Sequence, residues 1–129
     1  MKKGDSFSYT FSLTETIYNG FIAIFNDMNP LHTDCQFAQN HGFSDKVMHG
    51  NILNGFLSYF IGEKLPIKNV IIQTQEIKYY KPVYLHDSLQ FRAVIEDVFE
   101  SVKTIELKFV FENQNQVKVA RGKVQIGIL

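Results

Sequence analysis

The hydrophobic pattern changes its period near the middle of the chain. Before Pro66 most apolar residues recur every three or four positions, and after it they tend to alternate with polar ones. The first spacing indicates helices with one buried face, and the second indicates strands with one buried face. A short strand-like stretch, FSYTF, precedes the helices. The order of strand, helices and then strands predicts an α+β fold.

The first helix is expected to begin after Thr14 and to end near Asn26. Thr14 is a plausible N-cap residue, because its side-chain oxygen can accept a hydrogen bond from a free backbone N–H. Pro30 disfavours a helical conformation at Asn29, so the helix should stop before it. This boundary delivers Asp27 at the C-terminal edge of the helix.

A second, short helix can follow Asp34 as its N-cap, and the longest helix is expected between Gly50 and Pro66. The apolar stripe of this long helix consists of Ile52, Leu53, Phe56, Leu57, Phe60 and Ile61. So broad a stripe predicts the most buried helix of the protein. Gly50 lies at its N-terminus, where free N–H groups and the positive end of the helix dipole point outward.

Four strands are expected in the second half, joined by turn-like breaks into an antiparallel meander. Their sequences are NVIIQTQEIKYYKPV, DSLQFRAVIEDV, KTIELKFVFEN and QVKVARGKVQIGIL. In the last segment the alternation changes phase between Val119 and Ala120. This change is typical of a β-bulge, but a stretch buried on both faces would produce it too.

The length and the net charge of the chain limit the classes of function that it can have. The 129 residues fit one domain, residues 1–129. Thirteen basic residues balance thirteen acidic ones, so the net charge of zero argues against nucleic acid as a partner. No segment approaches the ~20 apolar residues of a membrane span, and no apolar run follows the first lysines, so we expect a cytoplasmic protein. The lone Cys35 cannot form an internal disulfide and is expected to pack as a small residue near the loop that precedes it.

The loop DMNPLHTD, residues 27–34, concentrates the polar chemistry of the chain. Asp27 and His32 lie five positions apart across a proline-stiffened turn, so both can reach one small molecule or one water. A carboxylate and a histidine in such positions can act as general base and acid. An alternative stays open, in which Asp27 and Asp34 cap adjacent helices while His32 packs half-buried.

A metal site is a second alternative for the same region. His32, Asp34, His41 and His49 could gather around a divalent ion. Their spacing contains neither the i, i+4 histidine pair nor the paired cysteines that are typical of zinc sites. We therefore expect no metal and no other cofactor.

Three segments resemble the MaoC-like dehydratase family, the (R)-specific enoyl-thioester hydratases. They are DMNPLHTDCQFA, then VMHGNIL after a short connection, and later YYKPVYLHDSL. The resemblance covers most of the chain. It implies a hotdog fold, in which a curved antiparallel sheet wraps a long central helix and two such units pair into a homodimer.

The resemblance also implies roles for individual residues. Asp27 and His32 match the catalytic pair that activates the water added across a trans-2-enoyl thioester. Gly50 matches the glycine whose backbone N–H binds the thioester oxygen.

The set of substrate-binding residues implied by the resemblance also includes Asn29, His49 and Ser58. Asn29 is expected to hold the loop in shape, and Ser58 falls where many members have a small polar residue. The chain departs from the family at Asn26 and His86, where glycine is frequent. Both positions lie beside the motifs, so they affect loop geometry more than chemistry.

The sequence therefore predicts a hydro-lyase of fatty acid metabolism that hydrates trans-2-enoyl thioesters or dehydrates (R)-3-hydroxyacyl thioesters. The acyl chain would be carried on coenzyme A or on an acyl carrier protein. Two alternatives are a hotdog thioesterase, for which Glu63 would be the carboxylate, and a catalytically silent acyl-binding module. The chain length, the carrier and the direction of the reaction stay open.

Overall fold

The computed structural model describes residues 1–129 and contains one five-stranded sheet with helices on one side and at one end. The elements are β1 (Ser6–Ser12), α1 (Glu15–Phe25), α2 (Pro30–Thr33), α3 (Cys35–Asn40), α4 (Asn51–Tyr59), the π-helical turn η1 (Phe60–Lys64), β2 (Val70–Tyr79), β3 (Ser88–Phe99), the 3-10 turn η2 (Glu100–Val102), β4 (Thr104–Glu112) and β5 (Lys118–Ile128). The predicted order of strand, helices and four strands is confirmed.

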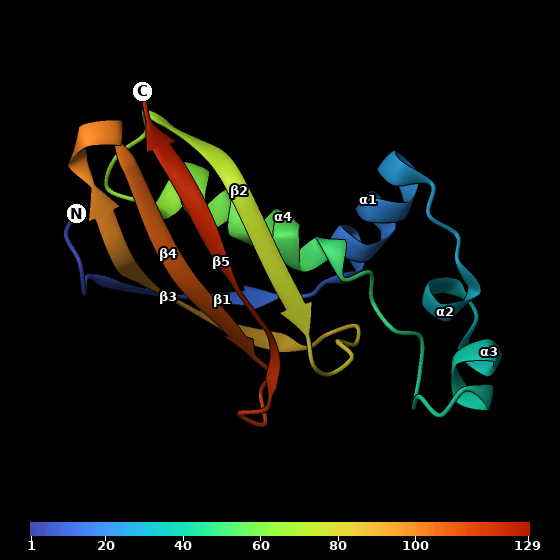
Figure 1. Ribbon diagram of the computed structural model, residues 1–129. Coiled ribbons are helices and arrows are strands. Elements are labelled where there is room, and N and C mark those ends of the chain that lie inside the picture. The colour runs from blue at the N-terminus through green and yellow to red at the C-terminus, as the bar shows by residue number, and fades with distance from the viewer.

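The sheet is antiparallel throughout and curves around α4 (Figure 1). Its strand order is β1-β3-β4-β5-β2. The prediction of a four-strand meander was wrong for β2, which pairs with β5 at the far edge instead of with β3. The reason is that β2 follows α4, and a helix that covers the sheet can return the chain to the edge opposite β1. Alternation identifies a strand, but it carries no information about that strand's neighbours.

Aromatic contacts join α4 and η1 to the sheet. Phe56 stacks on Phe11 of β1 at 4.5 Å between ring centroids, and Phe60 contacts Phe91 of β3 at 4.7 Å. Phe60 and Phe91 are at most 1% exposed. Full burial of one such side chain stabilises the fold by roughly 1.5–3 kcal/mol. The prediction that this helix is the most buried one is confirmed.

Local signals set most helix ends. The Thr14 side chain accepts a hydrogen bond from the N–H of Ile17 at 3.2 Å, and α1 stops at Phe25 because Asn26 adopts a left-handed conformation with φ 58°. The long helix stops before Pro66, as predicted, but its last turn widens into η1. The apolar stripe runs unbroken through this π-turn, so the sequence pattern did not reveal it.

The change of phase in the last strand is a β-bulge. Phe111 pairs with Ala120, whereas the next residue, Glu112, pairs with Lys118. Val119 is therefore the extra residue on β5. Both Val119 and Ala120 are fully buried, so the bulge turns two consecutive side chains away from solvent.

A lobe made of α1, α2, α3 and the connection to α4 lies beyond one end of the sheet (Figure 1). Its buried residues between positions 14 and 50 are Tyr18, Ala38, Met48 and His49.

Cys35 is exposed, so the prediction that it packs was wrong. The reason is that α3 turns its first residue outward. A hydrogen bond to Asp45 raises the pKa of its thiol, which disfavours the thiolate form that acts as a nucleophile. None of the helices combines the length and apolar character needed to cross a membrane.

Candidate active site

The loop that carries Asp27 is stiffened by two short-range hydrogen bonds. The backbone N–H of Asn29 donates to the Asp27 carboxylate at 3.2 Å, and the Asn29 side chain accepts from the N–H of Leu31 at 3.0 Å. Asn29 thereby caps α2, which begins at Pro30. Asp27 itself is exposed and caps no helix. The loop turns because its polar residues satisfy one another, and it presents the Asp27 carboxylate in a defined position.

His32 is held in one tautomer by the backbone. Its Nδ1 lies 2.7 Å from the carbonyl oxygen of Val47, and a carbonyl can only accept, so Nδ1 carries the proton. In the neutral ring Nε2 is then free to accept a proton. The hydroxyl of Tyr18 donates to the His32 carbonyl, and the N–H of Val47 donates to Leu31 at 3.0 Å. These contacts fix both the ring and the backbone of α2.

His49 connects the start of α4 to the loop. The side chain is 2% exposed, and its Nε2 donates to the carbonyl oxygen of Asp27 at 2.9 Å. Its Nδ1 is buried and has no partner in the protein. The His49 ring lies 4.0 Å from the His32 ring and 4.6 Å from that of Phe21, measured between centroids. His49 is thus fixed between the catalytic candidates and the apolar side of α1.

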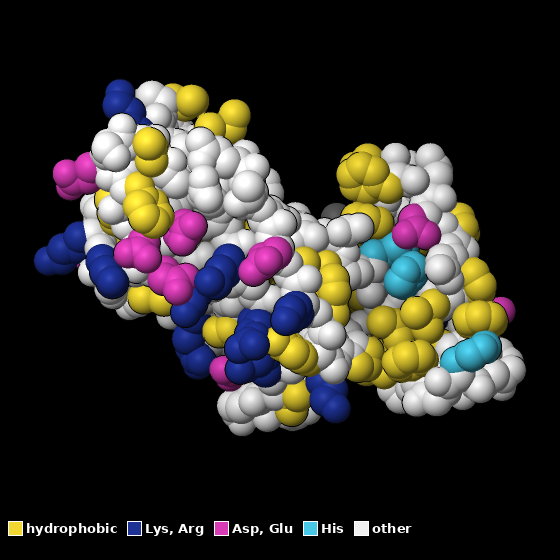
Figure 2. Space-filling model, in the orientation of Figure 1, with side chains coloured by type: hydrophobic (Ala, Val, Ile, Leu, Met, Phe, Trp, Pro, Cys, Tyr) yellow, Lys and Arg dark blue, Asp and Glu magenta, His cyan; other side chains and the backbone are white.

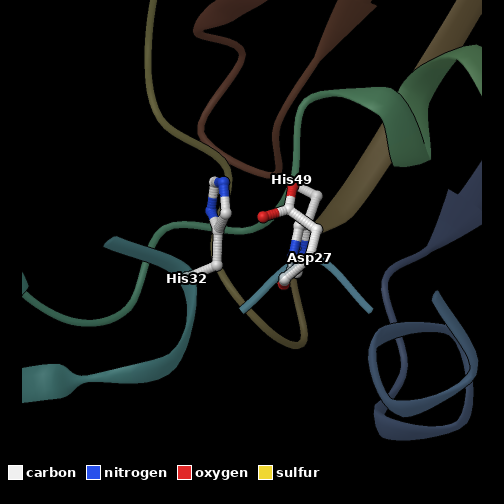
Figure 3. Close-up of side chains that lie close together, drawn as sticks. All are labelled: Asp27, His32 and His49. Atoms are coloured by element: carbon white, nitrogen blue, oxygen red, sulfur yellow. Dashed lines mark hydrogen bonds between the residues drawn. The ribbon is translucent and has the colours of Figure 1, made fainter. Parts of the chain in front are cut away.

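Asp27, His32 and His49 converge in space (Figure 3). One potential ligand or proton-transfer atom from each lies within 4.8 Å of the others. The carboxylate of Asp27 points toward the side on which His32 lies. The arrangement combines a carboxylate, an imidazole whose Nε2 makes no hydrogen bond within the chain and a buried imidazole whose Nδ1 has no partner.

Gly50 is the N-cap residue of α4, and its N–H makes no hydrogen bond within the chain. A hollow of about 480 Å³, here called the site hollow, is lined by both His32 and Gly50. A Cβ on Gly50 would lie 2.9 Å from the ring of Tyr79, so only glycine fits there without displacing that ring. Burial raises the pKa of the Tyr79 phenol, and a hydrogen bond from Asn54 acts in the opposite direction.

Two predicted residues lie apart from this group. Ser58 is exposed on α4, eight positions after Gly50, which is about 12 Å along a helix. Glu63, the carboxylate on which the thioesterase alternative depends, lies in η1, thirteen positions after Gly50 and so roughly 20 Å away. The structure brings neither side chain to Asp27 and His32.

The four residues that were considered as the metal-site alternative do not come together. Asp34 caps α3 by accepting from the N–H of Phe37 at 3.2 Å, as the alternative reading of the loop proposed. His41 is exposed, and its Nδ1 contacts the carbonyl of Phe37 at 2.8 Å. His32 and His49 come together with Asp27 instead, and not with Asp34 or His41.

Sequence reasoning missed the groups that orient His32. The carbonyl of Val47 carries no signal, because any residue supplies the same backbone atom. Tyr18 lies among the apolar positions of α1, so the sequence pattern did not mark its hydroxyl as a hydrogen-bond donor. Tyr79 belongs to the YYKPV segment, so the motif pointed to its neighbourhood but not to its contact with Gly50.

Comparisons with known proteins agree with this geometry. The MaoC like domain family matches residues 2–118. The chain is 28% identical over 131 residues to an (R)-specific enoyl-CoA hydratase of Rhodospirillum rubrum, covering 95% of this chain and 91% of that one. It is 24% identical over 126 residues to a mitochondrial 3-hydroxyacyl-[acyl-carrier-protein] dehydratase of Arabidopsis thaliana, covering 95% and 75% respectively.

A solved structure supports the fold. The unliganded R-hydratase of Pseudomonas aeruginosa superimposes with a TM-score of 0.89 at 25% identity, covering 99% of this chain and 82% of that one. The hotdog fold expected from the resemblance is thereby confirmed. With the family match over nearly the whole chain, the conclusion is that this protein belongs to the MaoC-like dehydratase family of hydro-lyases.

Proposed function

We propose that the enzyme adds water to trans-2-enoyl thioesters to form (R)-3-hydroxyacyl thioesters, and catalyses the reverse dehydration. The observation that carries this proposal is the convergence of the Asp27 carboxylate and the His32 imidazole, together with the free N–H of Gly50 in a hollow that His32 also lines. The relatives named as hydratases and dehydratases support it. The acyl chain is carried on coenzyme A or on an acyl carrier protein.

In the proposed hydration, Asp27 and His32 hold one water between them. The water oxygen bonds to C3 of the enoyl chain while one of its protons passes to the acid/base pair. The electron pair of the C2–C3 double bond moves toward the thioester oxygen. C2 then takes a proton from the pair, which returns to its starting state. Dehydration follows the same steps in reverse.

The negative charge that develops on the thioester oxygen needs a donor that is already in position. The N–H of Gly50 serves this role in the proposal, since it is free and stands at the N-terminus of α4. Loss of one such donor typically costs about 3 kcal/mol of transition-state stabilisation. Asn29 acts by holding the loop, and His49 acts as a positioning residue through the Asp27 carbonyl.

The test of the acid/base pair is an absorbance assay that follows the enoyl thioester, with crotonyl and longer acyl chains. Asp27→Asn and His32→Gln should each lower kcat by about 100-fold or more, because general acid/base catalysis is worth that much. Both side chains lie outside the core, so the melting temperature should stay close to that of the wild type. Folded variants that keep more than a tenth of the wild-type turnover would contradict the assignment.

We also infer a homodimer. In a single chain β2 leaves one side of its backbone unpaired, and apolar side chains beside Asp27 are open to solvent. The most exposed of them are Ile24, Phe25 and Met28, at 72%, 65% and 60%. Sedimentation at micromolar concentration should give twice the mass of the chain, and a purely monomeric mass would rule the dimer out.

A further inference from the structure

Basic side chains gather on the face of the sheet that points away from α4. Ala120 is fully buried, so the alternation of β5 turns Arg121 outward. A hollow of about 910 Å³ on this face, the outer hollow, is lined by Lys78, Arg92, Lys108, Lys118, Arg121 and Lys123. The acidic residues that line the same hollow are Glu76 and Glu112, so its lining carries more basic than acidic side chains although the whole chain has no net charge. Figure 2 shows that Lys and Arg side chains gather over the sheet, with some acidic side chains among them.

Two cross-strand pairs on this face place like charges directly opposite each other. In the first, Lys108 of β4 faces Lys123 of β5, and Glu96 of β3 lies 2.8 Å from one ammonium and 3.6 Å from the other. In the second, Lys78 of β2 faces Arg121 of β5. No carboxylate lies within 4 Å of either cation in this second pair.

Like charges directly opposite on adjacent strands destabilise a sheet. The protein neutralises the Lys108–Lys123 pair internally but leaves the Lys78–Arg121 pair without a counter-ion. Lys118 likewise has no ion-pair partner, since its neighbour Glu112 is engaged by Arg92 at 3.1 Å.

These unpaired cations adjoin the candidate active site. The guanidinium of Arg121 lies over the ring of Tyr80, 5.6 Å from its centroid. Tyr80 lines the site hollow together with His32, Gly50 and a further exposed cation, Lys81. The N–H groups of Tyr80 and Lys81 both donate to the carbonyl of Val119, at 2.8 and 3.3 Å, so the bulge of β5 anchors this junction. We name Lys78, Lys81, Lys118 and Arg121 the basic rim.

We propose that the basic rim binds the phosphate of the pantetheine arm that carries the acyl thioester, and so orients the thioester toward Gly50. The proposal rests on the proposed function. A thioester in the site hollow would extend its carrier past Lys81, which lines the hollow, and past Arg121, which lies over the ring of Tyr80 in the same lining. Arginine and lysine together suit a phosphate, because the guanidinium can donate two parallel hydrogen bonds and the ammonium adds a compact charge. The same phosphate occurs in coenzyme A and in acyl carrier proteins.

The experiment compares three crotonyl thioesters that differ in phosphate content: those of coenzyme A, of phosphopantetheine and of N-acetylcysteamine, which has no phosphate. Arg121→Ala and Lys81→Ala should each raise KM for crotonyl-coenzyme A by about fivefold, and the double variant roughly 20-fold, with kcat nearly unchanged. KM for the N-acetylcysteamine thioester should not change. Lys123→Ala is the matched control, because it removes a cation of the same face that Glu96 already neutralises.

The phosphate that is recognised is identified by the thioesters for which the variants raise KM. An effect that persists with phosphopantetheine and with a crotonyl carrier protein supports recognition of the arm phosphate as proposed. An effect confined to coenzyme A would overturn that assignment in favour of the nucleotide phosphates. Equal changes with the N-acetylcysteamine thioester, or no change with any thioester, would overturn the subsite altogether.

Calorimetric titration with coenzyme A itself separates this proposal from the proposed reaction, since it requires no turnover. The wild type should bind coenzyme A, with an affinity that falls as salt is raised, and the Lys81/Arg121 double variant should bind it roughly 20-fold more weakly. If the wild type turns over no enoyl thioester yet shows this difference, the reaction assignment fails and the subsite stands. Indistinguishable binding by the wild type, the double variant and Lys123→Ala would remove the subsite.

Discussion

The sheet with its central helix and the lobe of α1 to α3 are stabilised in different ways. The first region buries a continuous set of aliphatic and aromatic side chains, among them Phe60, Phe91 and Phe111 at 1% exposure or less. The lobe buries few residues, and individual hydrogen bonds from Tyr18, His32 and His49 hold its loops.

This difference assigns separate tasks to the two regions. Burial of apolar surface is non-directional, so it supplies stability but does not aim a single side chain. Hydrogen bonds are directional and each contributes less to stability, so in the lobe they can orient Asp27 and His32 without supplying much of the folding free energy. Changes in the sheet should therefore lower stability, and changes in the lobe should lower activity.

The greatest change that we expect is a loss of stability on substitution in the core of the sheet. Phe91→Ala should lower the free energy of unfolding by about 3–5 kcal/mol, because it removes a fully buried ring that contacts Phe60 and Phe111. Urea denaturation at a fixed protein concentration measures the change. Phe99→Ala is the control at a ring that is 43% exposed, and it should cost far less. Equal losses at both positions would show that the aromatic core does not dominate stability.

In the lobe we expect a smaller change, a fall in kcat, when the hydrogen bond from His49 is removed. His49→Phe keeps a ring of similar size but removes the Nε2 donor to the Asp27 carbonyl, so the loop should loosen. We expect kcat to fall about tenfold, as befits one neutral hydrogen bond, with KM within a factor of about two. His49→Gln restores an N–H donor and should recover most of the loss. A melting temperature that falls in step with kcat in both variants would instead make His49 a stability residue.

Removal of metal ions is expected to have no effect on turnover. Asp27, His32 and His49 could in geometry hold a divalent ion, but the proposed reaction needs only proton transfer. Exhaustive chelation should therefore leave turnover unchanged, and His41→Ala should do the same, since His41 is exposed and away from the group. Activity that is lost on chelation and returns with added zinc, iron or manganese would overturn the acid/base mechanism.

Local signals in the sequence predicted much of the structure. The cap at Thr14, the end of α1 before Asp27 and the start of α4 at Gly50 depend on residues close in the chain, so each could be inferred from a few letters. The bulge at Val119 was visible as a break in alternation, although burial on both faces remained an equal explanation until the strand register resolved it.

Contacts distant in sequence could not be predicted. The pairing of β2 with β5 joins segments about fifty positions apart, and the alternation of each strand is compatible with several neighbours. For the same reason the bond from His49 to the Asp27 carbonyl and the bond from His32 to the Val47 carbonyl left no trace in the pattern. A backbone carbonyl is common to every residue, so no letter marks it as a partner.

The α+β order, the two ends of α1, the start of α4 and the motif residues Asp27, His32 and Gly50 could be inferred from the sequence alone, because these follow from short-range chemistry and from resemblance to a family. The assembled structure was needed to show that His49 donates to the Asp27 carbonyl and that Ser58 and Glu63 lie apart from Asp27 and His32. It also decided that Lys78 and Arg121 face each other without a counter-ion while Lys108 and Lys123 share Glu96. Strand register sets which charges meet, and register is a property of the assembled sheet.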